Sequence, residues 1–165
     1  MNPVESDNTN ELAPLIFISH RSTDEGLAKK VRDLLMHAFH MRASEIRCTS
    51  VVGSKLPAGA NSSAVLSREI SACKVFIALL TKSSVESSYV LFELGARWGM
   101  NKRIFPLIGP DSDFSVLPPP IRDANALKTS VREDVQQLLS DVRRDSGWHL
   151  EDPHAYNDQL EQLLG

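Results

Sequence analysis

The chain has 165 residues and a net charge of −3, with 42% hydrophobic and 24% charged residues. This composition is that of one soluble globular domain. It argues against a nucleic-acid partner, because no basic block is present, and against a membrane, because no run approaches about 20 apolar residues. The two cysteines, Cys48 and Cys73, have neither metal-ligand spacing nor a disulfide-rich background, so we expect a cytoplasmic protein with reduced thiols.

The chain opens with a polar, acidic stretch, residues 1–13, which predicts a disordered leader and no secretory signal. The domain is expected over residues 14–165. Residues 14–19 form a short apolar run that predicts a strand buried on both faces. After a polar loop, 20–24, Thr23 is expected to cap a helix with one apolar face. That face holds Leu27, Val31, Leu34, Leu35 and Ala38.

Residues 45–50 predict a second strand, placed near an edge of the sheet by its charges. A long loop with two glycines and one proline follows over residues 51–63. Ordered loops of this length often carry function, although a plain surface connection is the alternative. A helix over 64–73 then leads into residues 74–81, the most apolar strand of the chain, which we expect at the centre of the sheet.

Residues 87–99 predict the helix around which the site is organised. Ser87 or Ser88 can cap it, and Leu91, Leu94 and Trp98 share one face by their three-to-four-residue spacing. Tyr89 and Glu93 are four residues apart, so a ring and a carboxylate lie one above the other. The alternative interpretation is a solvated surface glutamate.

The remaining elements complete an alternating pattern. Residues 103–108 predict a strand whose proline favours its end or an irregular edge, and residues 109–123 hold four prolines and predict irregular backbone. A short strand over 125–129, a helix over 131–142 and a last helix from Pro153 follow. This order predicts a flavodoxin-like α/β fold of three layers, with about five parallel strands and helices on both faces of the sheet.

Ligands of such sheets bind beyond the carboxyl ends of the strands, where the loops 20–24, 51–63 and 82–88 meet near Glu93. The sequence has no dinucleotide or phosphate-loop signature, no hydrolase nucleophile elbow and no histidine spacing for a metal, so no metal or cofactor is expected. One carboxylate, an aromatic ring and an Arg/His loop fit cleavage of a glycosidic bond through an oxocarbenium-like transition state. A second carboxylate is not evident, but nicotinamide leaves as a neutral base without one.

Four motifs in order resemble a bacterial Toll/interleukin-1 receptor (TIR) domain. They are Ile16–Arg21, Leu56–Gly59, Tyr89–Leu94 and Lys102–Ile108. The resemblance implies five parallel strands and an NAD+ glycohydrolase, with possible ADP-ribose cyclase activity and NAD+ as substrate rather than cofactor. It assigns Glu93 as the catalytic residue. The residues that it implies for substrate binding are His20, Arg21, Leu56, Gly59 and Tyr89.

The sequence departs from the family pattern beside this glutamate. Tyr89 stands where tryptophan is common, and Val90 where cysteine or serine is frequent. These departures bear on rate and product more than on fold.

The resemblance also implies partners and a role. Enzymes of this kind serve in bacterial antiphage defence or signalling, are activated by homo-oligomeric TIR–TIR contacts, and answer a sensor domain or protein that is not visible in this chain. Two alternatives stay open: a non-enzymatic scaffold module, and a nucleoside deoxyribosyltransferase, which would act on deoxynucleosides and ignore NAD+.

Overall fold

The computed structural model describes residues 13–48 and 62–165. Leu56, Gly59 and the expected leader, apart from Ala13, lie outside these residues. Five parallel strands form one sheet in the order β2-β1-β3-β4-β5. The strands are β1 (Ile16–Ser19), β2 (Ile46–Cys48), β3 (Val75–Leu80), β4 (Phe105–Ile108) and β5 (Leu127–Lys128).

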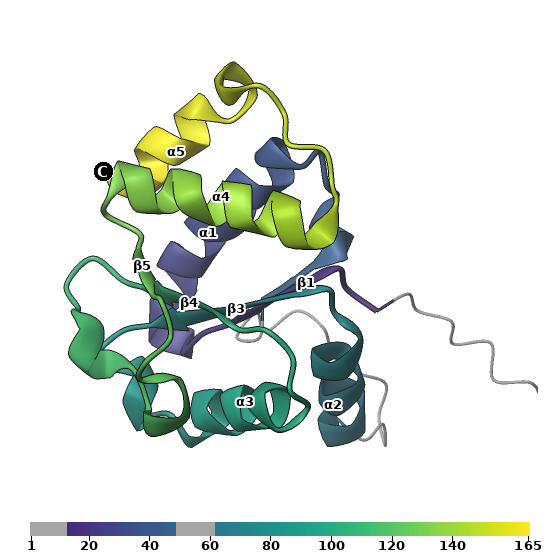
Figure 1. Ribbon diagram of the computed structural model, residues 1–165, viewed down its shortest axis with the longest axis vertical. Helices are drawn as coiled ribbons and strands as arrows, with labels where there is room; N and C mark the ends of the chain where they lie inside the picture. Colours follow the sequence, from purple (N-terminus) through teal and green to yellow (C-terminus); the bar gives the residue numbers. More distant parts are fainter. Residues whose placement is uncertain (1–12, 49–61) are drawn as a thin grey trace, which may run out of the picture.

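Helices cover both faces of this sheet, which confirms the predicted flavodoxin-like α/β fold (Figure 1). One face is covered by α1 (Glu25–Ala38), α4 (Arg132–Ser146) and α5 (Asn157–Leu164), and the other by α2 (Ser62–Ala72) and α3 (Ser88–Gly99). Each face has its own apolar core, because strand side chains alternate between the two faces.

Because of this alternation, the side chains of β1 lie on both faces of the sheet. Ile16 and Ile18 belong to the core under α1, whereas Phe17 belongs to the core under α3, where its ring stacks on Phe76 with centroids 5.3 Å apart. Ser19 has the same parity as Phe17. The last residue of β1 therefore points towards α3.

The positions of the strands agree with most of the sequence pattern. β2 lies at an edge and β3 at the centre, as predicted. The expectation for Pro106 is wrong, because it lies inside β4, between β3 and β5, and pairs with Ala78. The Gly109 amide donates to Leu80 of β3, so alternation turns the Pro106 position towards β5, which pairs only from Leu107 onward. The missing amide of Pro106 therefore costs no bond in the ladder.

The starts of two helices were predicted with different success. Ser87 caps α3, as expected, since its hydroxyl accepts from the Val90 amide at 3.4 Å. Thr23 does not cap α1: it lies in a 3-10 turn, and the residue before the helix is Asp24, which makes no capping bond. The Asp24 carboxylate instead accepts from the Thr81 hydroxyl at 2.8 Å, which ties α1 to the end of β3.

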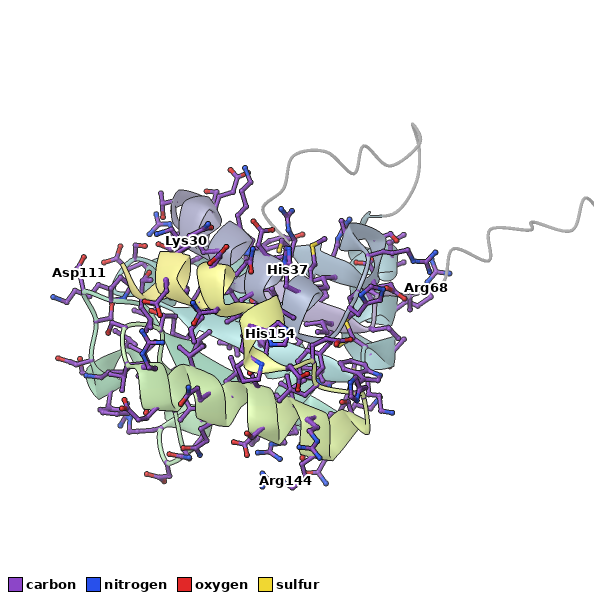
Figure 2. All side chains as sticks on the ribbon, turned by 90° about the horizontal axis from the view of Figure 1, so that it is seen from above. Lys30, His37, Arg68, Asp111, Arg144 and His154 are labelled. Atoms are coloured by element: carbon purple, nitrogen blue, oxygen red, sulfur yellow. The ribbon has the colours of Figure 1, made fainter. Side chains whose placement is uncertain are left out.

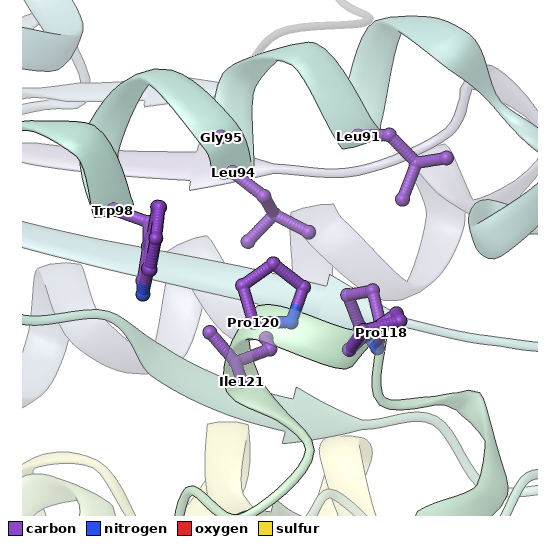
Figure 3. Close-up of a pocket in the computed structure, with 8 residues that line it drawn as sticks. Leu91, Leu94, Gly95, Trp98, Pro118, Pro120 and Ile121 are labelled. Carbon is purple, nitrogen blue, oxygen red and sulfur yellow. The ribbon is translucent and has the colours of Figure 1, made fainter.

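The buried face of α3 also differs from the one expected. Val90, Glu93, Leu94 and Arg97 are buried, whereas the side chains of Leu91 and Trp98 are 40% and 57% exposed. Leu91, Leu94 and Trp98 do share a side of the helix, but that side borders an apolar cavity of about 240 Å³ against the proline segment 118–121 (Figure 3). The orientation predicted from hydropathy alone is therefore wrong by a fraction of a turn about the helix axis.

Charged side chains lie on several sides of the molecule. Figure 2 shows Lys30, Arg68, Asp111 and Arg144 spread around its periphery. Among the described helices, none has the length and apolar character needed to cross a membrane.

Candidate functional site

Glu93 is the most unusual polar group on the inner side of α3. Glu93 is 0% exposed to solvent. This burial is unusual because an ionised carboxylate loses its hydration when it is buried, which costs free energy. Ser19, also 0% exposed, donates its hydroxyl to Glu93 Oε2. The other oxygen, Oε1, is buried and has no hydrogen-bond partner among the described residues. One carboxylate oxygen is therefore held by the protein, and the other is left for something else.

Burial changes the protonation of this carboxyl group. Desolvation raises the pKa of Glu93 from 4.5 to about 7, while the Ser19 hydrogen bond and the charge of Arg47 act in the opposite direction. Arg47 lies on β2 and forms an ion pair with Glu69 of α2 at 3.2 Å. Both protonation states of Glu93 are consequently populated near neutral pH, which is the condition for a group that changes charge during a reaction.

The topology of the sheet brings Ser19 and Glu93 together. The chain leaves β1 for β2 on one side and returns to β3 on the other, so the direction of strand order reverses at the carboxyl ends of β1 and β3. Such a point is where open α/β sheets bind ligands. Glu93 on α3, the helix after β3, thus contacts the last residue of β1.

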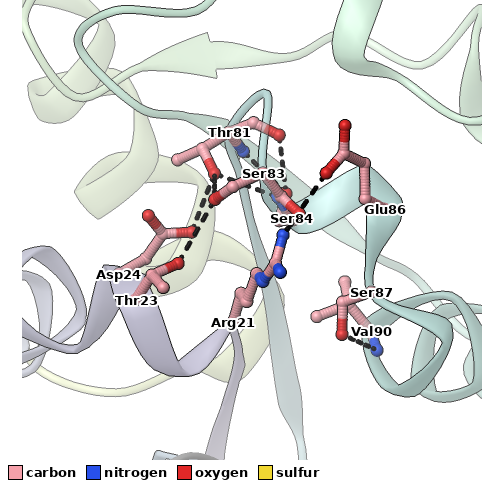
Figure 4. Close-up of polar contacts among 9 residues, drawn as sticks. All are labelled: Arg21, Thr23, Asp24, Thr81, Ser83, Ser84, Glu86, Ser87 and Val90. Atoms are coloured by element: carbon pink, nitrogen blue, oxygen red, sulfur yellow. Dashed lines mark hydrogen bonds and ion pairs between the residues drawn. The ribbon is translucent and has the colours of Figure 1, made fainter.

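The loops that follow β1 and β3 are joined by polar contacts at this edge (Figure 4). The Arg21 guanidinium donates to the Ser83 carbonyl at 2.6 Å and lies 3.6 Å from the Glu86 carboxylate. The Thr81 hydroxyl, already bound to Asp24, lies 3.0 Å from that of Ser83. These contacts fix the rim of the site from two segments about 60 residues apart in sequence.

The predicted substrate-binding residues take different positions around this edge. His20 is buried, and its Nδ1 donates to the Ile18 carbonyl at 3.2 Å; burial lowers the pKa of its imidazole. The Arg21 side chain is about one-third exposed, with the contacts given above. Tyr89 is 55% exposed, so its ring is open to solvent one turn before the buried Glu93. Leu56 and Gly59 lie outside the described residues.

Two residues with a direct influence on Glu93 were not predicted. In the sequence, Ser19 belongs to an apolar run; its hydroxyl at the carboxyl end of a buried strand, with the parity of Phe17, is the signal that indicates its position. In the sequence, the charge of Arg47 indicates only that its strand lies near an edge of the sheet. Its effect on the Glu93 carboxyl depends on the pairing of β2 with β1, which no local pattern gives.

Within residues 13–48 and 62–165, no group of three or more His, Cys, Asp or Glu side chains could hold a metal ion.

Comparisons with known proteins agree with this architecture. A family model described as "TIR domain" matches residues 16–139. Among solved structures, the chain is similar to a metazoan TIR-STING receptor from C. gigas, solved in complex with 2',3'-cGAMP, with a TM-score of 0.57 and 19% identity. The match covers 85% of this chain and 41% of the receptor, so it supports the fold, and the chain spans less than half of that protein. No curated protein matches the chain.

Proposed function

Because the chain belongs to the TIR domain family, we propose that it is an NAD+ glycohydrolase that cleaves the bond between nicotinamide and ribose, with Glu93 as its catalytic carboxylate. The observation that carries the proposal is the buried Glu93 carboxyl, held through Oε2 by Ser19 while Oε1 lacks a partner among the described residues. A structural carboxylate in this position would have both oxygens satisfied.

The chemistry follows from charge. As the bond to nicotinamide breaks, the ring leaves as a neutral base and positive charge develops on the ribose, where a carboxylate at Oε1 stabilises it. A pKa of about 7 means that neutral pH leaves Glu93 part protonated. The positively charged nicotinamide ring of NAD+ favours the ionised form as it enters, so substrate binding itself prepares the group. Attack on the ribose by water gives ADP-ribose, and attack by the adenine ring gives a cyclic product.

The remaining substrate contacts come from the rim. The exposed ring of Tyr89 offers a stacking surface for a base, and Arg21 offers a cation for the diphosphate if it leaves Glu86. His20, Leu56 and Gly59 complete the set that the family resemblance implies.

The resting chain must also change before it can act. Glu93 has no exposed surface, so a substrate reaches Oε1 only after the surrounding residues move. Self-association through TIR–TIR contacts is the proposed trigger, with a separate sensor and a role in bacterial antiphage defence or signalling.

A second function, a non-enzymatic scaffold, is favoured by a different observation. Leu91, Phe92 and Trp98 on α3 are all substantially exposed, which is typical of a surface that binds protein.

One experiment separates the two functions. The purified protein is incubated with NAD+ over a wide dilution series, and nicotinamide and ADP-ribose species are resolved by chromatography. We expect nicotinamide release that rises more than linearly with protein concentration and is lost in Glu93→Ala and Glu93→Gln. Glu133→Gln, an exposed carboxylate on α4, is the control that should retain activity. Release that both Glu93 variants preserve would remove Glu93 from the catalytic role, and no release from the concentrated parent protein would favour the scaffold.

A further inference from the structure

The residue that holds Glu93 is itself firmly held. Ser19 ends β1, its backbone is in register with Ala78 of β3, and its side chain has no exposed surface. β1 pairs with strands on both sides, and Ser19 itself is in register with β3, so the sheet rather than α3 sets the position of its backbone. The hydroxyl is therefore a fixed point against which the carboxyl of a helix residue is aligned.

The hydrogen bond has a direction with chemical consequences. A serine hydroxyl has one proton, and here that proton goes to Glu93 Oε2, where it favours the ionised form of the carboxyl group. Of the charged residues around the carboxyl, Arg47 favours the same form. With Oε2 occupied by the Ser19 hydroxyl, Oε1 is the oxygen left for a ligand.

From this geometry we propose that Ser19 is a positioning residue of the site: it binds Glu93 through Oε2 and thereby presents Oε1 to the substrate. The proposal rests on the function proposed above. It assigns to the last residue of β1 a role that the polar loop after it, with His20 and Arg21, does not have.

The test combines a titration with kinetics. The side-chain carboxyl carbon of Glu93 is labelled with ¹³C and titrated by NMR in the parent protein and in Ser19→Ala, Ser19→Thr and Ser84→Ala. Ser84 is the matched control, because it is another buried serine near this edge whose hydroxyl bonds to Thr81 rather than to the carboxylate. NAD+ cleavage is measured for the same proteins, with kcat and KM determined separately.

We expect Ser19→Ala to raise the titration midpoint of Glu93 by about one pH unit, since a hydrogen bond to a charged group is lost. It should lower kcat about tenfold with little change in KM. Ser19→Thr keeps the hydroxyl and should restore both, whereas Ser84→Ala should leave the midpoint at its parent value. If Ser19→Ala does not fold, Ser19→Cys, nearly equal in size and a weak donor, should give a smaller upward shift.

An unchanged midpoint in a folded Ser19→Ala or Ser19→Cys protein would overturn the proposal, as would an equal shift in Ser84→Ala. The titration needs no activity. Absence of NAD+ cleavage in every protein would thus remove the proposed function, while the midpoints would still decide whether Ser19 holds the carboxyl group.

Discussion

Glu93 and Arg97 lie one turn apart on the inner side of α3, and both side chains are withdrawn from solvent. Arg97 is surrounded by acceptors: its Nη1 donates to the carbonyls of Ile70 and Cys73 at 2.9 and 3.0 Å, and its Nε donates to the carbonyl of Arg103 at 3.2 Å. Glu93 receives one hydrogen bond, from Ser19, and keeps a bare oxygen among the described residues.

The difference separates a charge that joins elements of the fold from the charge to which the proposed function assigns the chemistry. Arg97 donates hydrogen bonds to carbonyls at the end of α2, where the helix dipole favours a cation. Its guanidinium also lies 5.7 Å from the centre of the Phe76 ring. It joins α3 to α2, to the segment before β3 and to the segment before β4. Glu93 makes a single connection, to Ser19 of β1, and Oε1 has no hydrogen-bond partner among the described residues, so its burial costs stability that a ligand could recover.

The largest expected effect comes from removing the structural charge. Arg97→Met should lower the free energy of unfolding by about 3 kcal/mol, because three carbonyls, two of them in buried contacts, lose their donor. Arg97→Lys should fall between parent and Met, since one ammonium cannot reproduce the planar fork. Urea unfolding followed by circular dichroism measures both. A loss below about 0.5 kcal/mol for Arg97→Met would remove the contrast with Glu93.

Replacing Glu93 should change the free energy of unfolding in the opposite direction at neutral pH, because the buried carboxylate lacks a partner for one oxygen. The folded-state pKa of Glu93, about 7, lies above the unfolded value of 4.5, so the unfolded chain releases this proton first as pH rises. The parent protein should therefore lose about 3 kcal/mol of stability between pH 4.5 and pH 7 relative to Glu93→Gln, which has no proton to release. The readout is the difference between their urea unfolding free energies at each pH.

The comparison with Glu93→Gln is needed because the buried His20 imidazole also makes the stability depend on pH. Burial lowers the pKa of its imidazole, so its contribution to stability is present above the unfolded pKa of 6.5 and is lost as pH falls from there through the lower folded-state pKa, opposite in sign to that of Glu93. Both proteins contain His20, and its effect cancels in the comparison. Parallel stability curves for parent and Glu93→Gln would show that burial does not perturb the carboxyl group.

The smallest effect is expected where a charge pair faces water. Arg132 and Glu161 approach to 2.5 Å, closer than any acceptor of Arg97, yet their side chains are 42% and 51% exposed. Arg132→Ala should cost no more than about 0.5 kcal/mol, because solvent screens the pair. A thermal melt in low and high salt tests this. A loss as large as that of Arg97→Met would mean that contact distance, rather than burial, decides the energy.

Much of the fold could be predicted because its signals are local. The apolar runs of β1 and β3 identify buried strands, and the alternation with amphipathic helices specifies a parallel sheet. The orientation of α3 could not be predicted in the same way. Leu91, Leu94 and Trp98 form a helical stripe, and so do Val90, Glu93 and Arg97; hydropathy favours the first, whereas the second is buried.

The second stripe is buried because of partners far away in sequence. Two of the three carbonyl acceptors of Arg97 lie 24 and 27 residues earlier, and Ser19 lies 74 residues before Glu93. Glu93 itself could be chosen from the sequence as the candidate carboxylate, but the state of its two oxygens could not. That state depends on sheet order, on the parity of β1 and on Arg47 in a neighbouring strand.

The separation of 74 residues between Ser19 and Glu93 has a consequence for folding as well. A contact of such long range closes a large loop, and its entropy is recovered only when β1, β3 and α3 have assembled. The ionisation of Glu93 therefore reports on the order of assembly. In a refolding chain the pKa of Glu93 should rise from 4.5 to about 7 only when α3 packs against β1 and buries the carboxyl group. Proton uptake near neutral pH would then show when during refolding the site forms.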